Sequence, residues 1–297
     1  MRRLQTENCD VVTVPHERLD LCDGEAVREW LEQTRPEIVF VAAAKVGGIL
    51  ANDSHPAVFL RDNMAIELNL IHESYRVGVE KLLFLGSSCI YPRLSPQPIP
   101  EEALMSGPLE PTNQWYAIAK IAGIRLCQAY RRQYGCNFIS AMPTNLYGPG
   151  DNFDLLSSHV APALMRKAHE AKESGQPSLQ VWGSGQPMRE FMYADDCADA
   201  LVHLMKHYSH DLHVNIGTGS DISISDLATT ICDIVDYRGR IEFDTSKPDG
   251  MPRKRLDVSR LHDLGWHHTT PFEEGLQKTY AWYLDNVVAH SPMAANG

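Results

Sequence analysis

The sequence lacks the features that mark membrane, secreted and nucleic-acid-binding proteins. No apolar run is long enough to span a bilayer, and the first seven residues, MRRLQTE, are not apolar, so we expect no signal peptide. The seven cysteines are scattered without a C-x-x-C pair, which favours a reducing, cytoplasmic compartment over a disulfide framework. The 38 Asp and Glu residues outnumber 27 Lys and Arg residues, and the net charge of −11 disfavours nucleic acid and anionic membranes as partners. No His spacing predicts a metal site.

A glycine-rich turn after a first strand is also missing. A dinucleotide-binding sheet normally opens with such a strand and turn, which holds a pyrophosphate at a helix N-terminus. Here the first recognisable strand, DVVTV (10–14), corresponds to the second strand of that pattern. The GTG sequence at 217–219 lacks the third glycine, and we interpret it as a turn. We therefore expect a sheet without its first strand, so that residues 1–297 alone either misfold or bind the cofactor very weakly.

What is present is an alternation of strands and helices. Short apolar runs predict strands, amphipathic stretches between them predict helices, and the alternation is typical of an α/β doubly wound parallel sheet. The predicted strands are 10–14, 38–42, 81–86 and 137–142. The predicted helices are 24–33, 57–77 and a helix that contains Tyr116, follows a loop over 92–112 and ends at about residue 134. The pattern loosens after residue 150. We expect a Rossmann-like lobe of residues 1–150 with about 191–220, and a smaller α+β substrate lobe of residues 151–190 with 221–297.

Tyr116 and Lys120 are four residues apart in the stretch NQWYAIAK (113–120). On a helix this spacing places both side chains on one face, where an ammonium favours phenolate and lowers the pKa of the Tyr. The pair alone is weak evidence, because Tyr and Lys meet at this spacing by chance on many helices. Upstream, the apolar strand at 82–85 ends in small hydroxyl residues that include Ser87. Together the three side chains predict a Ser/Tyr/Lys acid–base set.

Seven segments carry a resemblance to a known family. They are AAAKVGGI (42–49), LLFLGSSCIYP (82–92), LEPTNQWYAIAKIAG (109–123), MPTNLYGPGDNF (142–153), SHV (158–160), VWGSGQPMREF (181–191) and KPDGMPRK (247–254). In this order they resemble the extended short-chain dehydrogenase/reductases and, within them, the GDP-L-fucose synthases. No single segment is specific, whereas their combination is.

The resemblance implies NADP(H) as cofactor and a two-part reaction that converts GDP-4-keto-6-deoxy-D-mannose to GDP-L-fucose. Cys89 and His159 would remove and return protons at sugar carbons 3 and 5. Ser87 and Tyr116 would hydrogen-bond the enolate oxygen, and Tyr116 would protonate the alkoxide that forms when carbon 4 is reduced. Lys120 would tune Tyr116 and bind the nicotinamide ribose.

The resemblance also implies two sets of binding residues. The cofactor set is Asp20, Leu85, Gly86, Ser87, Ser88, Lys120, Pro143, Thr144, Asn145, Leu146 and His159, and the substrate set is Lys167, Trp182, Arg189, Asp249 and Lys254. Ordinary interpretations stand beside these roles: a buried apolar thiol for Cys89, and solvated surface charges and a core indole for the substrate set. His16 stands where the family often has Arg, which weakens the case for selecting the 2′-phosphate of NADPH.

Two alternatives stay open. The first is another epimerase or dehydratase of nucleoside-diphosphate sugars from the same superfamily, although a 4,6-dehydratase typically needs an Asp-Glu pair where Ser88 and Cys89 stand here. The second is a truncated paralogue that binds a partner without catalysis, which only the missing glycine-rich segment supports. The family also suggests a homodimer, with the Tyr116 helix and the helix before it at the interface.

Overall fold

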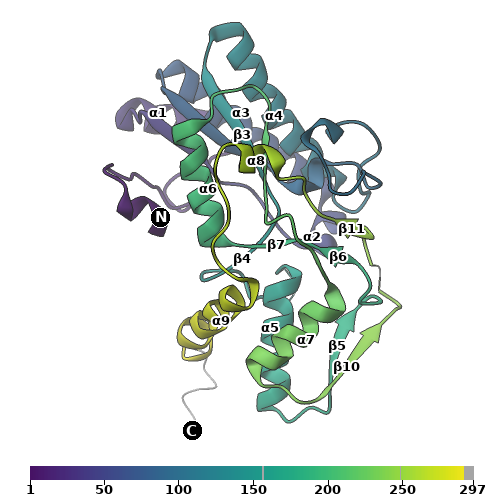
Figure 1. Cartoon of the computed structure of the whole chain (residues 1–297). Helices are drawn as coiled ribbons and strands as arrows, with labels where there is room; N and C mark the ends of the chain where they lie inside the picture. The colour runs from purple at the N-terminus through teal and green to yellow at the C-terminus, as the bar shows by residue number, and fades with distance from the viewer. Residues whose placement is uncertain (156, 248, 291–297) are drawn as a thin grey trace.

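Four parallel strands form the central sheet (Figure 1). The computed structural model describes residues 1–155, 157–247 and 249–290. The sheet order is β1-β2-β3-β8, with bounds β1 (Ile38–Val41), β2 (Lys81–Leu85), β3 (Asn137–Pro143) and β8 (Val214–Ile216). Leu85 at the end of β2 lies opposite Ala141 of β3. The segments that leave the carboxyl ends of these two strands are therefore neighbours.

Alternating side chains of β2 face two different helical layers. Leu82 and Phe84 belong to the core under one layer, and Leu83 belongs to the core under the other. The first layer is α1 (Gly24–Thr34), α3 (Pro56–Arg76) and α4 (Gln114–Tyr134), and the second is α6 (Ala194–His207) with α8 (Ser259–Asp263). A strand that is apolar on both faces needs helices on both faces. The predicted doubly wound α/β fold is confirmed.

Residues 10–14 do not form the predicted strand, so that prediction is wrong. Val11 and Val12 are 39% and 56% exposed, and this segment joins no sheet. β-branched residues favour a strand only where a neighbouring strand can pair with it. On the sheet's outer edge, β1 pairs with no strand other than β2 among the described residues, and its Ile38 is 51% exposed. The predicted helix at 24–33 and strand at 38–42 are confirmed as α1 and β1.

A second hydrophobic core lies under the sheet and belongs to the later part of the chain (Figure 1). Its helices are α5 (Val160–Glu173), α7 (Ile224–Val235) and α9 (Phe272–Tyr283), which continues as a π-helical turn over Leu284–Val288. The strands β4 (Asn145–Tyr147) and β7 (Phe191–Tyr193) pair and contribute side chains to this core and to the core under α6. Two further small sheets are β5 (Ser178–Trp182) with β10 (Arg240–Asp244), and β6 (Met188–Arg189) between β9 (Ile222–Ser223) and β11 (Arg253–Lys254). Short helices complete the elements: η1 (Arg2–Thr6), α2 (Ile49–Ser54), η2 (Ser88–Ile90) and η3 (Glu101–Ala103).

A buried polar network fixes the long loop that follows η2. The Tyr91 hydroxyl donates to Asn215 Oδ1 at 2.5 Å, and the Asn215 backbone N–H donates to Glu101 Oε1 at 3.0 Å. Arg260 lies 3.4 Å from the same Glu101 oxygen. The network therefore connects the loop to β8 and α8.

Among the described helices, none is long and apolar enough to cross a membrane.

Candidate active site

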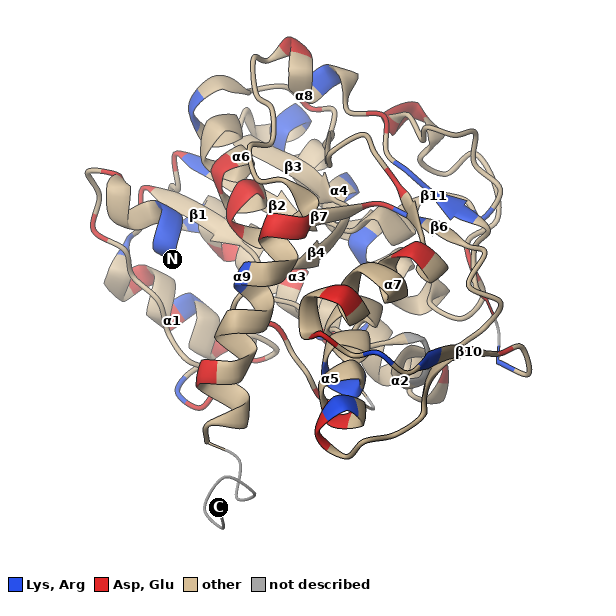
Figure 2. Cartoon of the chain, turned by 60° about the horizontal axis from the view of Figure 1, so that its bottom comes forward, with Lys and Arg blue, Asp and Glu red and all other residues tan. Residues whose placement is uncertain are grey.

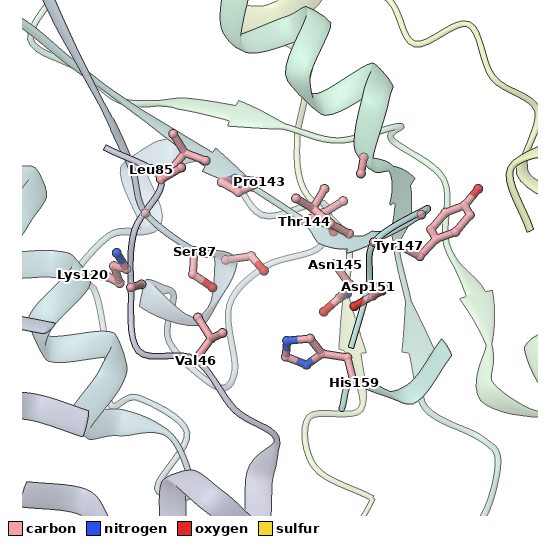
Figure 3. Close-up of a pocket in the computed structure, with 18 of the residues that line it drawn as sticks. Val46, Leu85, Ser87, Lys120, Pro143, Thr144, Asn145, Tyr147, Asp151 and His159 are labelled. Atoms are coloured by element: carbon pink, nitrogen blue, oxygen red, sulfur yellow. The ribbon is translucent and has the colours of Figure 1, made fainter. Parts of the chain in front are cut away.

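A pocket of about 380 Å³ opens at the carboxyl ends of β2 and β3 (Figure 3). This is where ligands bind in open parallel sheets. One wall comes from the segment after β2, one from α4, one from the segment after β3, and one from the start of α5. The lining residues that the sequence predicted are Leu85, Gly86, Ser87, Ser88, Tyr116, Lys120, Pro143, Thr144, Asn145, Leu146 and His159.

The turn after β2 places Ser87 at the pocket and Cys89 in the buried interior behind it. Ser87 is the N-cap of η2, and its Oγ accepts a hydrogen bond from the Cys89 backbone N–H at 3.5 Å. Cys89 is only 6% exposed and is not among the described residues that line the pocket. Burial raises the pKa of the Cys89 thiol, while Ser87 and the charges of Lys254 and Lys120 act in the opposite direction. The thiol therefore depends on nearby cations for any thiolate character.

Helix α4 brings Tyr116 and Lys120 to the same side of the pocket, as their spacing predicted. The Lys120 ammonium lies 5.7 Å from the Tyr116 ring centroid. Lys120 is also 3.0 Å from Glu67 Oε1 on α3, and both side chains are buried. Burial raises the pKa of Tyr116, and the charges of Cys89 and Glu67 raise it further. The net shift of this pKa is therefore upward, with burial as its main cause and Glu67 as a contributor, and the expected lowering by Lys120 stays a prediction.

His159 projects into the pocket from the opposite side (Figure 3). It is the N-cap residue of α5, and the residue as a whole is exposed although neighbouring groups surround its ring. Loss of contact with water lowers the pKa of His159, and the charge of Lys254 lowers it further. Neutral imidazole is thus the favoured form near neutral pH.

Two ammonium groups lie close to the ring of Trp182. Lys167 Nζ on α5 is 5.2 Å from the Trp182 ring, and Lys247 Nζ is 5.5 Å from it. The indole is 56% exposed, which leaves apolar surface open to a planar ligand. Asp249 is fixed nearby, because its carboxylate accepts hydrogen bonds from Ser184 N–H at 2.6 Å and Ser184 Oγ at 2.8 Å.

Arg189 and Lys254 are two further cations, which lie between the Trp182 region and the pocket. They are register partners in β6 and β11, and Arg189 Nη2 donates to the Asp249 carbonyl oxygen at 3.4 Å. Burial lowers the pKa of Lys254 to about 8, and the charge of Cys89 opposes that effect. Figure 2 shows β11 as a basic strand beside β6. All five residues of the predicted substrate set therefore form one connected row, which leads from Trp182 to the neighbourhood of Cys89.

Some site residues were not predicted, and one predicted residue lies elsewhere. Asp151, Val46 and Tyr147 also line the pocket, and burial raises the pKa of Asp151 to about 6. Their signal was present, since each lies in one of the segments that carry the resemblance. Asp20 is exposed in the loop before α1, accepts a hydrogen bond from Cys22 N–H, and does not line this pocket. Its role near the adenosine half of a cofactor stays a prediction.

Comparison with known proteins agrees with this geometry. A family model described as the NAD dependent epimerase/dehydratase family matches residues 1–217. The chain belongs to this family. It is 60% identical to the GDP-L-fucose synthase of Sinorhizobium fredii, over 97% of this chain and 91% of that protein. It is 52% identical to the GDP-L-fucose synthase of Escherichia coli, over 95% and 91%. The resemblance to GDP-L-fucose synthases is thereby confirmed.

A solved structure shows the same fold at useful similarity. It is a GDP-L-fucose synthetase from Naegleria fowleri bound to NADP, with a TM-score of 0.90 and 33% identity. The match covers 96% of this chain and 88% of that one. The fold similarity therefore extends across the central sheet and the second core.

Proposed function

We propose that this chain converts GDP-4-keto-6-deoxy-D-mannose to GDP-L-fucose, by epimerisation at carbons 3 and 5 and NADPH-dependent reduction at carbon 4. The observation that carries the proposal is one pocket lined by Ser87, Tyr116, Lys120 and His159, beside a group of cations in which the charge of Lys254 acts on His159. A diphosphate requires cations, and proton transfer beside a ketone requires a base and an acid. The GDP-L-fucose synthases to which the chain is similar support this assignment.

The pocket fits the nicotinamide end of NADP(H). Lys120 and Ser87 offer a charged and a hydroxyl group, and Leu85 and Pro143 offer apolar walls. We propose that these residues, with Gly86, Ser88, Thr144, Asn145, Leu146 and His159, hold the cofactor, and that Asp20 lies towards its adenosine half. When bound, NADPH supplies the hydride for carbon 4. The solved relative with NADP supports the choice of cofactor.

The protein's own groups would perform the proton transfers. The 4-ketone acidifies the hydrogens on carbons 3 and 5, and Cys89 and His159 would remove and return these protons on opposite faces of the sugar. Ser87 and Tyr116 would donate hydrogen bonds to the enolate oxygen. Tyr116 would then give its proton to the oxygen on carbon 4. Its raised pKa suits a donor that must remain protonated until the reduction.

The substrate's nucleotide would lie along the cation row. We propose that Trp182 packs on the guanine, that Lys167, Arg189 and Lys254 hold the diphosphate, and that Asp249 completes the set. We also propose a Rossmann-like lobe of residues 1–150 with about 191–220, a substrate lobe of residues 151–190 with 221–297, a homodimer, and a cytoplasmic location. Exposed Met64 and Leu68 on α3 and Ile118 on α4 support the homodimer, because they offer apolar surface at the expected interface.

The test is to incubate the chain with GDP-4-keto-6-deoxy-D-mannose and NADPH in deuterated water. We expect NADPH consumption and GDP-L-fucose that carries deuterium at carbons 3 and 5. Cys89→Ser should block the exchange, while the control Cys232→Ser, which changes an equally buried thiol in the second core, should not. A product of unchanged configuration would favour another reductase of the superfamily. No turnover at all would favour a non-catalytic paralogue.

A further inference from the structure

Glu67 and Lys120 form a buried ion pair behind the pocket. Lys120 Nζ lies 3.0 Å from Glu67 Oε1, and the side chains are 2% and 3% exposed. Lys120 lines the pocket, whereas Glu67 is not among its described lining residues. Moving two charges out of water is costly, and such a pair is weak evidence for a purely stabilising role. The position of Glu67 therefore calls for a role in the site.

Tight packing directs the carboxylate at Lys120. Gly123 on α4 leaves the space, because a Cβ there would lie 2.8 Å from Glu67 Oε2 and 2.4 Å from Phe84 Cζ. The Phe84 ring is also close, with its centroid 4.7 Å from Lys120 Nζ. Glu67 Oε2 has no hydrogen-bond partner among the described residues. Lys120 thus contacts both a carboxylate and an aromatic ring.

The charge of Glu67 acts on Tyr116. Besides Glu67 and Lys120, the described titratable groups whose charges interact around this pair are Tyr116 and Cys127 from α4 and Cys89 from η2. The strand β2 contributes only the uncharged ring of Phe84. Burial raises the pKa of Glu67 to about 7 while Lys120 opposes that effect. Burial is also the main cause of the raised pKa of Tyr116, and the charge of Glu67 raises it further. An ammonium without its counter-ion would instead favour the phenolate.

We propose that Glu67 is a positioning residue, which holds the Lys120 ammonium and offsets its charge so that Tyr116 stays a protonated phenol until it donates. This inference rests on the proposed function, in which Tyr116 protonates the reduced ketone. A dehydrogenase that works as an oxidant needs phenolate as its base, whereas a reductase needs the phenol as its acid. Glu67 would therefore fix the protonation state that reduction requires.

The test is the pH profile of kcat for NADPH consumption in Glu67→Gln, which keeps the shape of the side chain and removes its charge. We expect the alkaline limb to move to lower pH by about one unit or more, because Tyr116 loses its proton more easily beside an uncompensated ammonium. The near-ultraviolet absorbance of tyrosinate gives a second measurement. Subtracting the spectrum of the Tyr116→Phe variant in each background isolates the signal of that residue, which should titrate at lower pH in Glu67→Gln.

Two further variants separate positioning from folding. Glu73→Gln is the matched control, because Glu73 is another buried acid on α3 and pairs with Arg76 at 2.9 Å instead of with Lys120. Glu67→Asp keeps the negative charge but moves it farther from Lys120, so the alkaline limb should shift less than in Glu67→Gln. This variant tests the inference even if Glu67→Gln folds poorly. An unmoved limb in Glu67→Gln, or equal shifts in Glu67→Gln and Glu73→Gln, would overturn the inference. If the parent protein, without any substitution, forms no product, that result would count against the proposed function and not against the role of Glu67.

Discussion

Arg189 and Lys254 are register partners in two parallel strands, so their side chains leave β6 and β11 on the same face. The two cations belong to different ends of the site. Arg189 contacts the Asp249 backbone near Trp182, while the charge of Lys254 acts on Cys89 and His159. One strand pair therefore connects the proposed nucleotide site to the proposed proton-transfer site. The position of the substrate's diphosphate and the titration of the reacting groups should both depend on this pair.

The first prediction concerns Lys254→Met. The Lys254 cation lowers the pKa of both Cys89 and His159, so its removal should raise both. The whole pH profile of deuterium exchange at carbons 3 and 5 should therefore move to higher pH. Above about pH 8 the Lys254 ammonium loses its proton in the parent as well, so the two profiles should converge there.

The control for this prediction is Lys206→Met. Lys206 on α6 is also basic and ion-paired, but its Nζ lies 2.7 Å from Glu7, away from the pocket. Its exchange profile should match that of the parent. A profile that does not move in Lys254→Met, or that moves to lower pH, would show that Lys254 does not act on the exchanging groups.

The second prediction concerns Tyr116→Phe, which removes the proposed proton donor and keeps the ring. A positioned donor typically contributes about 10²–10⁴-fold, so reduction should fall by at least tenfold while GDP-sugar affinity stays nearly the same. NADPH consumption and equilibrium binding of the nucleotide sugar measure the two quantities. Tyr134→Phe, on the same helix and 48% exposed, should change neither. Reduction at more than a tenth of the parent rate would remove Tyr116 from the mechanism.

The local sequence predicts those features of the site that depend on residues close to one another in the chain. The four-residue spacing of Tyr116 and Lys120 fixes their shared helix face, and the end of β2 fixes Ser87, so both were predictable. Residues 10–14 have the composition of a strand, but a strand also needs a partner, and composition cannot supply one. The prediction failed for that reason.

The Glu67–Lys120 pair shows a different limit. Glu67 lies in a stretch of α3 that resembles any amphipathic helix, far from Lys120 in sequence. Its burial depends on how closely α3 and α4 approach around Gly123, which only the packed structure shows. The sequence therefore did not show the burial and the nearby carboxylate that together raise the pKa of Tyr116.

The third prediction concerns Lys167→Ala, which removes one ammonium from the Trp182 face. Hydrogen bonds to charged groups contribute about 1.5–3 kcal/mol, so KM for the GDP-sugar should rise roughly 10- to 150-fold with a smaller change in kcat. Lys278→Ala is the matched control, because Lys278 Nζ lies 5.8 Å from another ring, that of Tyr193. Steady-state kinetics measure both variants. Equal KM values in the two variants would exclude Lys167 from substrate binding.

The last prediction concerns Glu190, a fully buried carboxylate that connects three segments of the chain. Its Oε1 accepts the backbone N–H groups of Thr218 at 2.6 Å and Gly219 at 2.7 Å, and its Oε2 accepts the N–H of Leu256 at 2.8 Å. In Glu190→Gln one oxygen becomes an NH₂ group, which cannot accept, so at least one buried N–H loses its partner. We expect the free energy of unfolding to fall by about 1–3 kcal/mol.

Urea unfolding of the parent and of Glu190→Gln, measured at the same pH, gives the difference in the free energy of unfolding. Glu242→Gln is the control, since Glu242 on β10 is more exposed and its carboxylate accepts from Gln180 Nε2 at 2.6 Å on the neighbouring strand. That change should alter the free energy of unfolding by less than about 0.5 kcal/mol. Because Leu256 follows Lys254 by two residues, Glu190→Gln should also loosen β11 and raise KM for the nucleotide sugar. Equal stability of the two variants would show that the amides near Glu190 find other acceptors, and that the carboxylate does not hold Lys254 in place.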